Sequence, residues 1–239
     1  MNLLVEIGNT ALKAAWSDGV TLGKTFRYQG EKVMDFILGL IQKEKPEIMA
    51  VASVYEISEY DRDLLKSECP NLLILDPNNK ETLQNHKLPY YLTYDRAAAI
   101  IAARYLFKDS GCTIVDFGTT LTIDNIDKDG MYEEGFISLG CRTRFKALNR
   151  YSRALPLLDS TEISDRKSLS LEGSMVEGVI SGIIFEIQGH LDSRPGNKVV
   201  FTGGDANFFA KRMKNSIFVV CNLVLMGLAL IADEHVRKN

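Results

Sequence analysis

The sequence predicts an α/β fold made of two similar halves, and three observations support this prediction. Short apolar runs typical of buried strands alternate with longer segments whose apolar residues recur at helical spacing. A strand–turn–strand pattern with an acidic residue, a glycine and a threonine at its turn occurs twice, 110 positions apart. The length of 239 residues allows one domain or two, so it accommodates such a duplication.

The first half, residues 1–110, is expected to alternate strands and helices. Apolar runs that end at turn signals predict strands at 2–7, 11–17, 21–28, 47–53 and 71–75. Helical spacing of apolar residues predicts helices at 31–43, 59–67 and 94–107. The polar segment 76–89 is expected to be an irregular loop. The helix at 94–107 is rich in alanine, which lets a neighbouring element approach closely.

The second half, residues 111–239, repeats this alternation. Strands are predicted at 112–117, 121–126, 131–138, 198–201 and 216–220. Helices are predicted at 141–152, 172–191, 206–213 and 222–236, with a polar loop at 159–168. A turn of Thr202-Gly203-Gly204-Asp205 is expected between a strand and the helix that follows it.

The repeated turns read Glu6-Ile7-Gly8-Asn9-Thr10 and Asp116-Phe117-Gly118-Thr119-Thr120, and each is followed by an Asp-Gly turn. An internal repeat decides the architecture when one is present, so these hairpins indicate a duplication. The alternative is chance, because Gly-Thr turns are common between paired strands.

The composition argues against several classes of function. With 28 Lys and Arg against 31 Asp and Glu, the net charge of −3 provides no field for nucleic acid. The densest basic run, 142–146, is typical of a solvated helix face. The longest apolar stretch, 223–232, is too short for a bilayer and contains Gly227, and the N-terminus does not resemble a signal peptide. The four cysteines form no Cys-x-x-Cys pair, so neither a zinc site nor a disulfide framework is expected. The expected compartment is the cytoplasm, and no membrane partner is expected.

The two glycine turns point to phosphate chemistry. Glycine lets a ligand approach the backbone, and successive N–H groups in such a turn can bind an anion. Lys13 adds a positive charge behind the first turn, and Gly203-Gly204 gives a third place for close approach. A carboxylate before each turn suits a bound cation rather than a bare phosphate. Most such turns only reverse the chain, but their combination favours phosphoryl transfer from a nucleotide.

Phosphoryl transfer to an alcohol also needs a base on the acceptor side. Asp95 and Arg96 stand at the start of the alanine-rich helix and are the candidates. The alternative for Asp95 is a carboxylate that stabilises a helix N-terminus, and for Arg96 a surface ion pair.

These motifs, in this order, resemble those of the type III pantothenate kinases, a family in the superfamily of acetate and sugar kinases, heat-shock chaperones and actin. The matching segments are Glu6–Lys13, Thr93-Tyr94-Asp95-Arg96, Asp116–Asp124, Glu134–Gly140, Ala147-Leu148, Leu155-Pro156, Thr202–Ala206 and Leu223–Leu228. The resemblance covers essentially the whole chain. It implies the duplicated ribonuclease H-like fold of actin-like ATPases, with a nucleotide cleft between two similar halves.

The resemblance also implies roles for single residues. Asp95 would be the general base on the primary hydroxyl of pantothenate, and Asp116 would hold a monovalent cation, K⁺ or NH₄⁺. Mg²⁺ would accompany ATP, with Glu6 as its protein ligand. The residues implied to bind ATP are Glu6, Ile7, Gly8, Asn9, Thr10, Ala11, Leu12, Lys13, Gly118, Thr119, Gly203 and Gly204. Those implied to bind pantothenate are His86, Thr93, Tyr94, Arg96 and either Ser174 or Met175.

Departures from the family pattern gather on the acceptor side. Thr93 replaces a glycine, His86 falls on a substrate-binding tyrosine, Glu134 replaces a glycine and Leu139 a proline. On the nucleotide side Glu6 replaces an aspartate and so extends its carboxylate by one methylene. Two alternatives therefore stay open: a kinase of another small alcohol, and a nucleotide-binding regulator that has lost the chemistry. The resemblance further implies a homodimer with the substrate site near the subunit interface.

Overall fold

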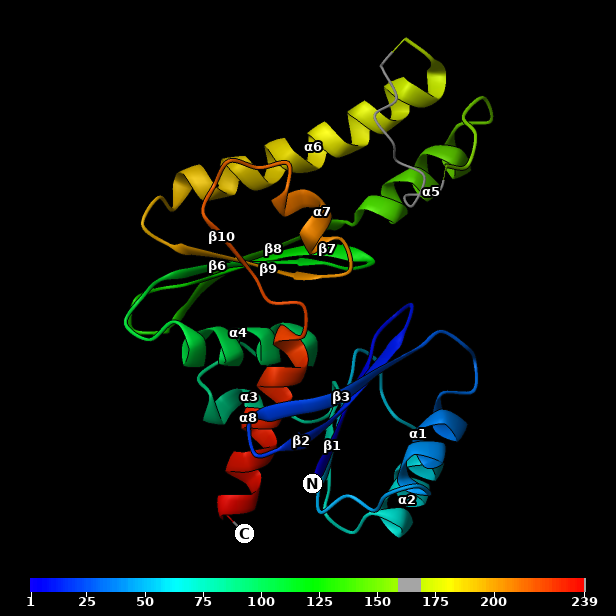
Figure 1. Ribbon diagram of the computed structural model, residues 1–239, viewed down its shortest axis with the longest axis vertical. Coiled ribbons are helices and arrows are strands. Elements are labelled where there is room, and N and C mark those ends of the chain that lie inside the picture. Colours follow the sequence, from blue (N-terminus) through cyan, green and yellow to red (C-terminus); the bar gives the residue numbers. More distant parts are fainter. Residues whose placement is uncertain (159–168, 239) are drawn as a thin grey trace. The chain divides into compact units, whose positions relative to one another are not determined.

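The structure, a computed structural model, describes residues 1–158 and 169–238 and divides the chain into two compact units (Figure 1). One unit comprises Met1–Leu106 together with the segment that starts at Asn222, and the other comprises Phe107–Cys221. The predicted loop at 159–168 lies outside the described residues. In the described ranges, no helix has both the length and the apolar character that a bilayer span requires.

The sheet of the first unit has the strand order β3-β2-β1-β4-β5. Its strands are β1 (Asn2–Ile7), β2 (Leu12–Asp18), β3 (Thr21–Tyr28), β4 (Met49–Ser53) and β5 (Leu72–Leu75). The first three strands form an antiparallel meander, and β1 also pairs with β4 in parallel. The central position of β1 explains its nearly continuous apolar run, because both of its faces are covered.

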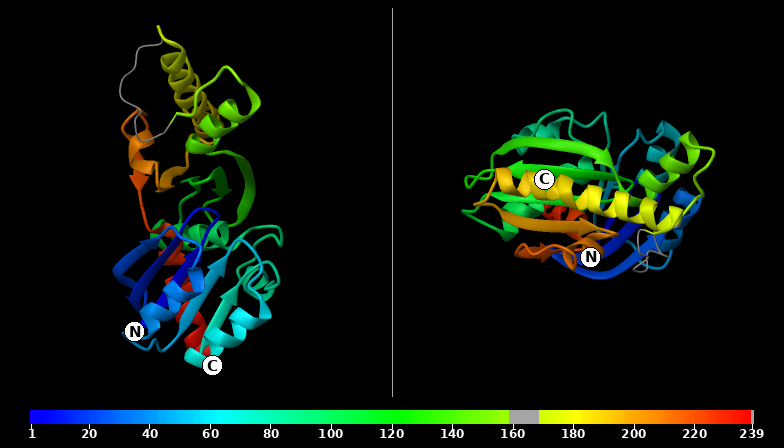
Figure 2. Two further views of the ribbon diagram at one scale, coloured as in Figure 1. Left: turned by 90° about the vertical axis from the view of Figure 1, so that its right-hand side faces the viewer. Right: turned by 90° about the horizontal axis from the view of Figure 1, so that it is seen from above.

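Helices cover both faces of this sheet. They are α1 (Val33–Ile41), α2 (Glu59–Glu68), the short α3 (Glu81–Asn85), α4 (Tyr94–Leu106) and α8 (Leu223–Lys238). Side chains of Leu3, Val5 and Ile7 pack with α1 and α2, which lie side by side on one face (Figure 2). Because successive residues of a strand point to opposite faces, Leu4 and Glu6 point to the face where α8 and α4 pack.

The closing helix belongs to the first unit. The predicted halves, 1–110 and 111–239, had placed it in the second. It lies along α4, where a Cβ added to Gly227 would come within 2.7 Å of Ala98 Cα. The alanine-rich surface of α4 thus accepts a close neighbour as expected, and that neighbour comes from the other end of the chain.

The second unit repeats the topology of the first. Its strands are β6 (Cys112–Phe117), β7 (Thr120–Ile126), β8 (Tyr132–Leu139), β9 (Lys198–Gly203) and β10 (Ile217–Val219). The order β8-β7-β6-β9-β10 matches β3-β2-β1-β4-β5 strand for strand, with the same parallel and antiparallel pairings. The prediction of an α/β fold with two similar halves is confirmed.

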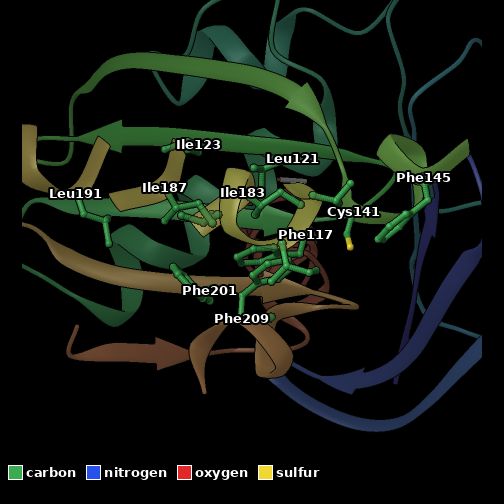
Figure 3. Packing of buried hydrophobic residues seen from close by; sticks show 14 of the residues in the cluster. Phe117, Leu121, Ile123, Cys141, Phe145, Ile183, Ile187, Leu191, Phe201 and Phe209 are labelled. Carbon is green, nitrogen blue, oxygen red and sulfur yellow. The ribbon is translucent and has the colours of Figure 1, made fainter. Parts of the chain in front are cut away.

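One face of the second sheet carries the apolar core of its unit. The helices there are α5 (Cys141–Tyr151), α6 (Leu171–Ser193) and α7 (Ala206–Ala210). Ile183, Ile187 and Leu191 of α6 pack against the strands, as Figure 3 shows. Phe117 stacks on Phe209 with ring centres 4.9 Å apart. This core holds the end of β6 firmly, immediately before the second glycine turn.

Two local predictions were wrong. The predicted loop 76–89 contains α3, because the side chain of Asn79 accepts a hydrogen bond from Thr82 N at 3.3 Å and Leu83 is buried. The strand predicted to end at 201 continues to Gly203, because Gly203 still pairs with Phe117 of β6.

Candidate functional site

The first glycine turn joins β1 to β2. Gly8 N donates to Ala11 O at 3.1 Å, which closes the turn and leaves Asn9 and Thr10 exposed. Glu6 and Lys13 lie opposite each other across the hairpin, and Lys13 Nζ is 3.4 Å from Glu6 Oε2. The turn therefore presents its backbone to solvent directly beside a carboxylate–ammonium pair.

Glu6 is the less exposed member of that pair. Its side chain is 12% exposed, and this burial raises the pKa of Glu6 above its ordinary value. Lys13 opposes the rise, whereas the negative charge of Asp95 adds to it. Glu6, near the end of β1, and Asp95, in the first turn of α4, belong to the same unit.

Asp95 and Arg96 occupy the first turn of α4. Asp95 Oδ1 accepts a hydrogen bond from Arg96 N at 2.9 Å, and a carboxylate there is stabilised by the helix dipole. Asp95 is half-buried and the Arg96 side chain is buried. The interpretation of Arg96 as a surface ion pair is therefore excluded. The Asp95 carboxylate therefore interacts with the N-terminus of α4.

The second glycine turn joins β6 to β7 and is held from both sides. Gly118 N donates to Thr120 O at 3.1 Å, and Gly140 N donates to Thr119 O at 3.1 Å. On the other side, Gly204 N donates to Phe117 O at 3.0 Å. Gly118 and Thr119 remain exposed, so three chain segments meet around an accessible turn.

Two glycines at this turn have no room for a side chain. Gly203 has a φ of +89°, and a Cβ added there would lie 2.6 Å from Phe117 O and would also overlap the Asp116 carboxylate. A Cβ at Gly140 would lie 2.9 Å from Thr119 O and would overlap Gly118 O. The backbone at Gly203 thus lies directly against the Asp116 carboxylate.

Gly140 and Thr143 belong to this turn and were not among the predicted site residues. Thr143 Oγ1 donates to Thr119 O at 2.6 Å from the first turn of α5. The available signal was a glycine standing between a predicted strand and a predicted helix.

The carboxylates fit a metal ion that arrives with a nucleotide. Across the described part of the chain, no three His, Cys, Asp or Glu side chains form a group suited to a metal. Magnesium bound with phosphates needs only one or two protein carboxylates. Glu6 and Asp116 each offer one, at equivalent positions of the two central strands. A cation would also offset the burial of the Glu6 charge.

The predicted acceptor residues divide into several environments. Thr93 is exposed, and its carbonyl accepts from Ala97 N at the start of α4. Tyr94 is buried, and its hydroxyl donates to Asn79 O at 2.8 Å. His86 Nε2 lies 3.4 Å from Glu234 Oε2 of α8, and His86 O accepts from Arg104 near the far end of α4. His86 is therefore engaged away from the helix terminus that carries Asp95.

The two alternatives on α6 also differ. Met175 is buried in the apolar core of the second unit, whereas Ser174 is exposed. Of the pair, only Ser174 can meet a ligand without a change in the core.

The structure thus forms two groups of predicted site residues, one in each unit. The first contains Glu6, Lys13 and Asp95, and the second contains Asp116, Gly118, Thr119, Gly203 and Gly204. Tyr94, His86 and Met175 face protein groups other than these.

Solved structures share this architecture. A conserved putative Baf family transcriptional activator from Campylobacter jejuni has a TM-score of 0.63 at 24% identity and covers 98% of this chain and 99% of that chain. The activator of 2-hydroxyisocaproyl-CoA dehydratase from Clostridium difficile has 0.58 at 14%, with 99% and 96% covered. A ROK hexokinase from Thermus thermophilus has 0.53 at 12%, with 95% and 96% covered. These likenesses show the fold alone, the duplicated fold of actin-like ATPases and sugar kinases.

Sequence relatives are more specific. The profile of the type III pantothenate kinase family matches residues 2–193. A type III pantothenate kinase from Phocaeicola vulgatus is 35% identical over 240 residues and covers 98% of this chain and 99% of the relative. One from Flavobacterium psychrophilum is 30% identical over 233 residues, with 95% and 97% covered. The glycine turns, the acidic residue before each, and the Asp-Arg pair thus stand in a chain that belongs to the type III pantothenate kinase family.

Proposed function

We propose that the protein transfers the γ-phosphoryl group of ATP to the primary hydroxyl of pantothenate and forms 4'-phosphopantothenate, the first step of coenzyme A synthesis. Family membership supports the reaction. The observation that carries the site assignment is that one unit holds both the Glu6–Lys13 pair at the first glycine turn and Asp95 in the first turn of α4.

The nucleotide side of the site uses the exposed turns. Residues 8–13 and Gly118-Thr119 form the two phosphate turns, in which the exposed Asn9, Thr10 and Thr119 offer backbone N–H groups to phosphate oxygens, and Lys13 supplies a positive charge. Glu6 would hold Mg²⁺, and Asp116 would hold K⁺ or NH₄⁺. When bound, these ions neutralise charge on the phosphates. Gly203 packs its backbone against Phe117 and Asp116, and Gly204, whose added Cβ would have no neighbour nearer than 4.0 Å, leaves space for close approach of the nucleotide.

Asp95 acts on the acceptor. Its carboxylate takes the proton of the pantothenate hydroxyl while that oxygen bonds to the γ-phosphorus and the bond to the bridging oxygen of ADP breaks. Arg96 binds the pantothenate carboxylate by charge-assisted hydrogen bonds, and Thr93 and Ser174 line the acceptor side.

The working form of the enzyme is a homodimer in the cytoplasm. The family resemblance supports the dimer. The four free cysteines are compatible with a reducing compartment, which also supplies the ATP.

The direct test incubates the purified protein with ATP, Mg²⁺, K⁺ and pantothenate and detects 4'-phosphopantothenate by mass spectrometry. Product is expected, and its absence would overturn the assignment. The altered acceptor residues, above all the engaged His86, favour one second candidate, a kinase of another small alcohol. A panel of alcohols in the same assay separates the two, because the preferred substrate has the highest kcat/KM.

Replacing Asp95 by Asn tests the base. We expect kcat to fall by at least about 100-fold, since general base catalysis contributes on that scale, while ATP binding persists. Asp63→Asn, which alters an exposed carboxylate on α2, is the matched control and should behave as wild type. Full turnover by Asp95→Asn would remove Asp95 from the mechanism.

A further inference from the structure

The segment between β5 and α4 is fixed at its start by a buried carboxylate. Asp76 follows β5 and is almost completely buried. Its Oδ2 accepts from Ile57 N at 3.1 Å and pairs with Arg62, and its Oδ1 accepts from Asn78 N at 3.1 Å. These contacts satisfy the buried charge and fix where the acceptor segment begins.

Asn79 then joins three elements. Its Nδ2 donates to Ile74 O of β5 at 2.9 Å, and its Oδ1 accepts from Thr82 N of α3. The hydroxyl of Tyr94 in α4 reaches both acceptors of the same residue, Asn79 O at 2.8 Å and Asn79 Oδ1 at 3.0 Å. The first turn of α4 is therefore tied to the segment that precedes it.

Tyr94 provides this connection from a buried position next to Asp95. Its side chain is 2% exposed, and burial raises the pKa of Tyr94 to about 12, so the hydroxyl stays protonated and donates. Successive residues of a helix point about 100° apart, so Tyr94 and Asp95 face different surroundings. The Tyr94 side chain fixes the first turn of α4, and the Asp95 side chain does not take part in that contact.

We propose that Tyr94 and Asn79 are positioning residues for the acceptor: their hydrogen bonds hold the first turn of α4 against residues 76–93 and so fix the direction of the Asp95 carboxylate. Tyr94 acts through Asp95 and does not touch substrate. This inference rests on the proposed function, and it assigns the two residues to the use of pantothenate rather than of ATP.

The test is Tyr94→Phe, which removes one oxygen and keeps the buried ring. The substitution leaves Asn79 O without its hydrogen-bond donor. Loss of one such hydrogen bond changes an equilibrium or rate constant by about ten-fold. We expect kcat/KM for pantothenate to fall about ten-fold while KM for ATP stays within about two-fold. Tyr60→Phe, the same change on an exposed tyrosine of α2, is the control and should leave both parameters unchanged.

Asn79→Ala and the double variant make the test specific. If the two residues act as one unit, the double variant should be little worse than the worse single variant in kcat/KM for pantothenate. Thermal unfolding of each variant separates positioning from loss of folding. If Tyr94→Phe does not fold, Asn79→Ala carries the test, and failure of both to fold would overturn positioning in favour of a structural role.

The possible results of these experiments distinguish failure of the positioning role from failure of the proposed function. A wild type that makes no 4'-phosphopantothenate overturns the proposed function and this inference together. An active wild type with an equally active Tyr94→Phe, or with equal losses for ATP and pantothenate, overturns the inference alone.

Discussion

The β1–β2 and β6–β7 hairpins occupy the same position in two equivalent sheets, but the surroundings of their carboxylates differ. Glu6 and Asp116 both precede the last residue of a central strand. The partner of Glu6 across its hairpin is Lys13, which pairs with it, whereas the partner of Asp116 is Thr122. The first hairpin therefore carries its own counter-charge within the same pair of strands, and the second hairpin has a neutral residue there.

The neighbouring parallel strands differ at the matching position. Ser53 ends β4 opposite Ile7, and its hydroxyl accepts from Tyr55 N at 3.2 Å. Gly203 ends β9 opposite Phe117 with a positive φ and no space for a Cβ. In the first unit a serine side chain occupies this corner, and in the second unit the Asp116 carboxylate and Phe117 O lie where a side chain of residue 203 would be. A duplicated topology thus supports two different glycine turns, and three substitutions test this comparison.

The largest stability effect is expected from Gly203→Ala. A positive φ costs a residue with a Cβ about 1–2 kcal/mol, and the overlap with Phe117 O and Asp116 adds to that cost. We expect a loss of at least about 2 kcal/mol, measured by chemical denaturation. Gly204→Ala is the matched control, because the nearest atom to its Cβ is 4.0 Å away, and it should change stability by less than about 1 kcal/mol. Equal stability of the two variants would contradict the special role of Gly203.

An intermediate effect is expected from Lys13→Met, which removes the counter-charge in the first hairpin and keeps much of the side-chain volume. Glu6 would lose the group that opposes its raised pKa, so that pKa should rise further. We expect the variant to lose about 1 kcal/mol of stability at pH 7 and to regain it below the ordinary Glu pKa of 4.5, where Glu6 is neutral. Stability curves at both pH values measure this, with the exposed Lys66→Met on α2 as control. A loss that is independent of pH would show that Lys13 acts through packing.

The smallest effect is expected from Glu6→Gln, and its sign is informative. Because burial raises the pKa of Glu6, the folded chain binds its proton more tightly than the unfolded chain. Wild-type stability from this group is therefore greatest below pH 4.5 and falls as the pH rises toward the raised pKa. Glutamine does not titrate, so the variant should gain up to about 1 kcal/mol relative to wild type between pH 4 and 7.

The control for this gain is Glu31→Gln, an exposed change that should show no such trend. If Glu6→Gln instead loses stability as the pH rises, the pair with Lys13 outweighs the cost of burial.

The repeat and most strands and helices could be predicted because their signals are local. Apolar runs, turn residues and helical spacing are properties of a few neighbouring residues. These local signals gave wrong predictions where contacts between residues far apart in the sequence determine the secondary structure. The helix α3 depends on the hydrogen bond from Thr82 N to the Asn79 side chain and on burial of Leu83, and β9 reaches Gly203 because β6 lies beside it.

Among the candidate site residues the same division holds. The sequence located both glycine turns and the Asp95-Arg96 pair. It could not show that the hydroxyl of Tyr94 turns to Asn79, that His86 pairs with Glu234, or that Met175 belongs to a core. Each of these depends on which element packs against that residue, and the partner lies outside its local sequence.

The sequence by itself determined the fold class, the duplication, the two carboxylate–glycine turns and the family resemblance, because residue type and spacing encode them. Only the tertiary structure decided that α8 completes the first unit and that the hydroxyl of Tyr94 bonds to Asn79. It also decided that Gly203 must lack a side chain. The physical reason is that packing and electrostatic coupling join atoms that are close in space, whatever their separation along the chain.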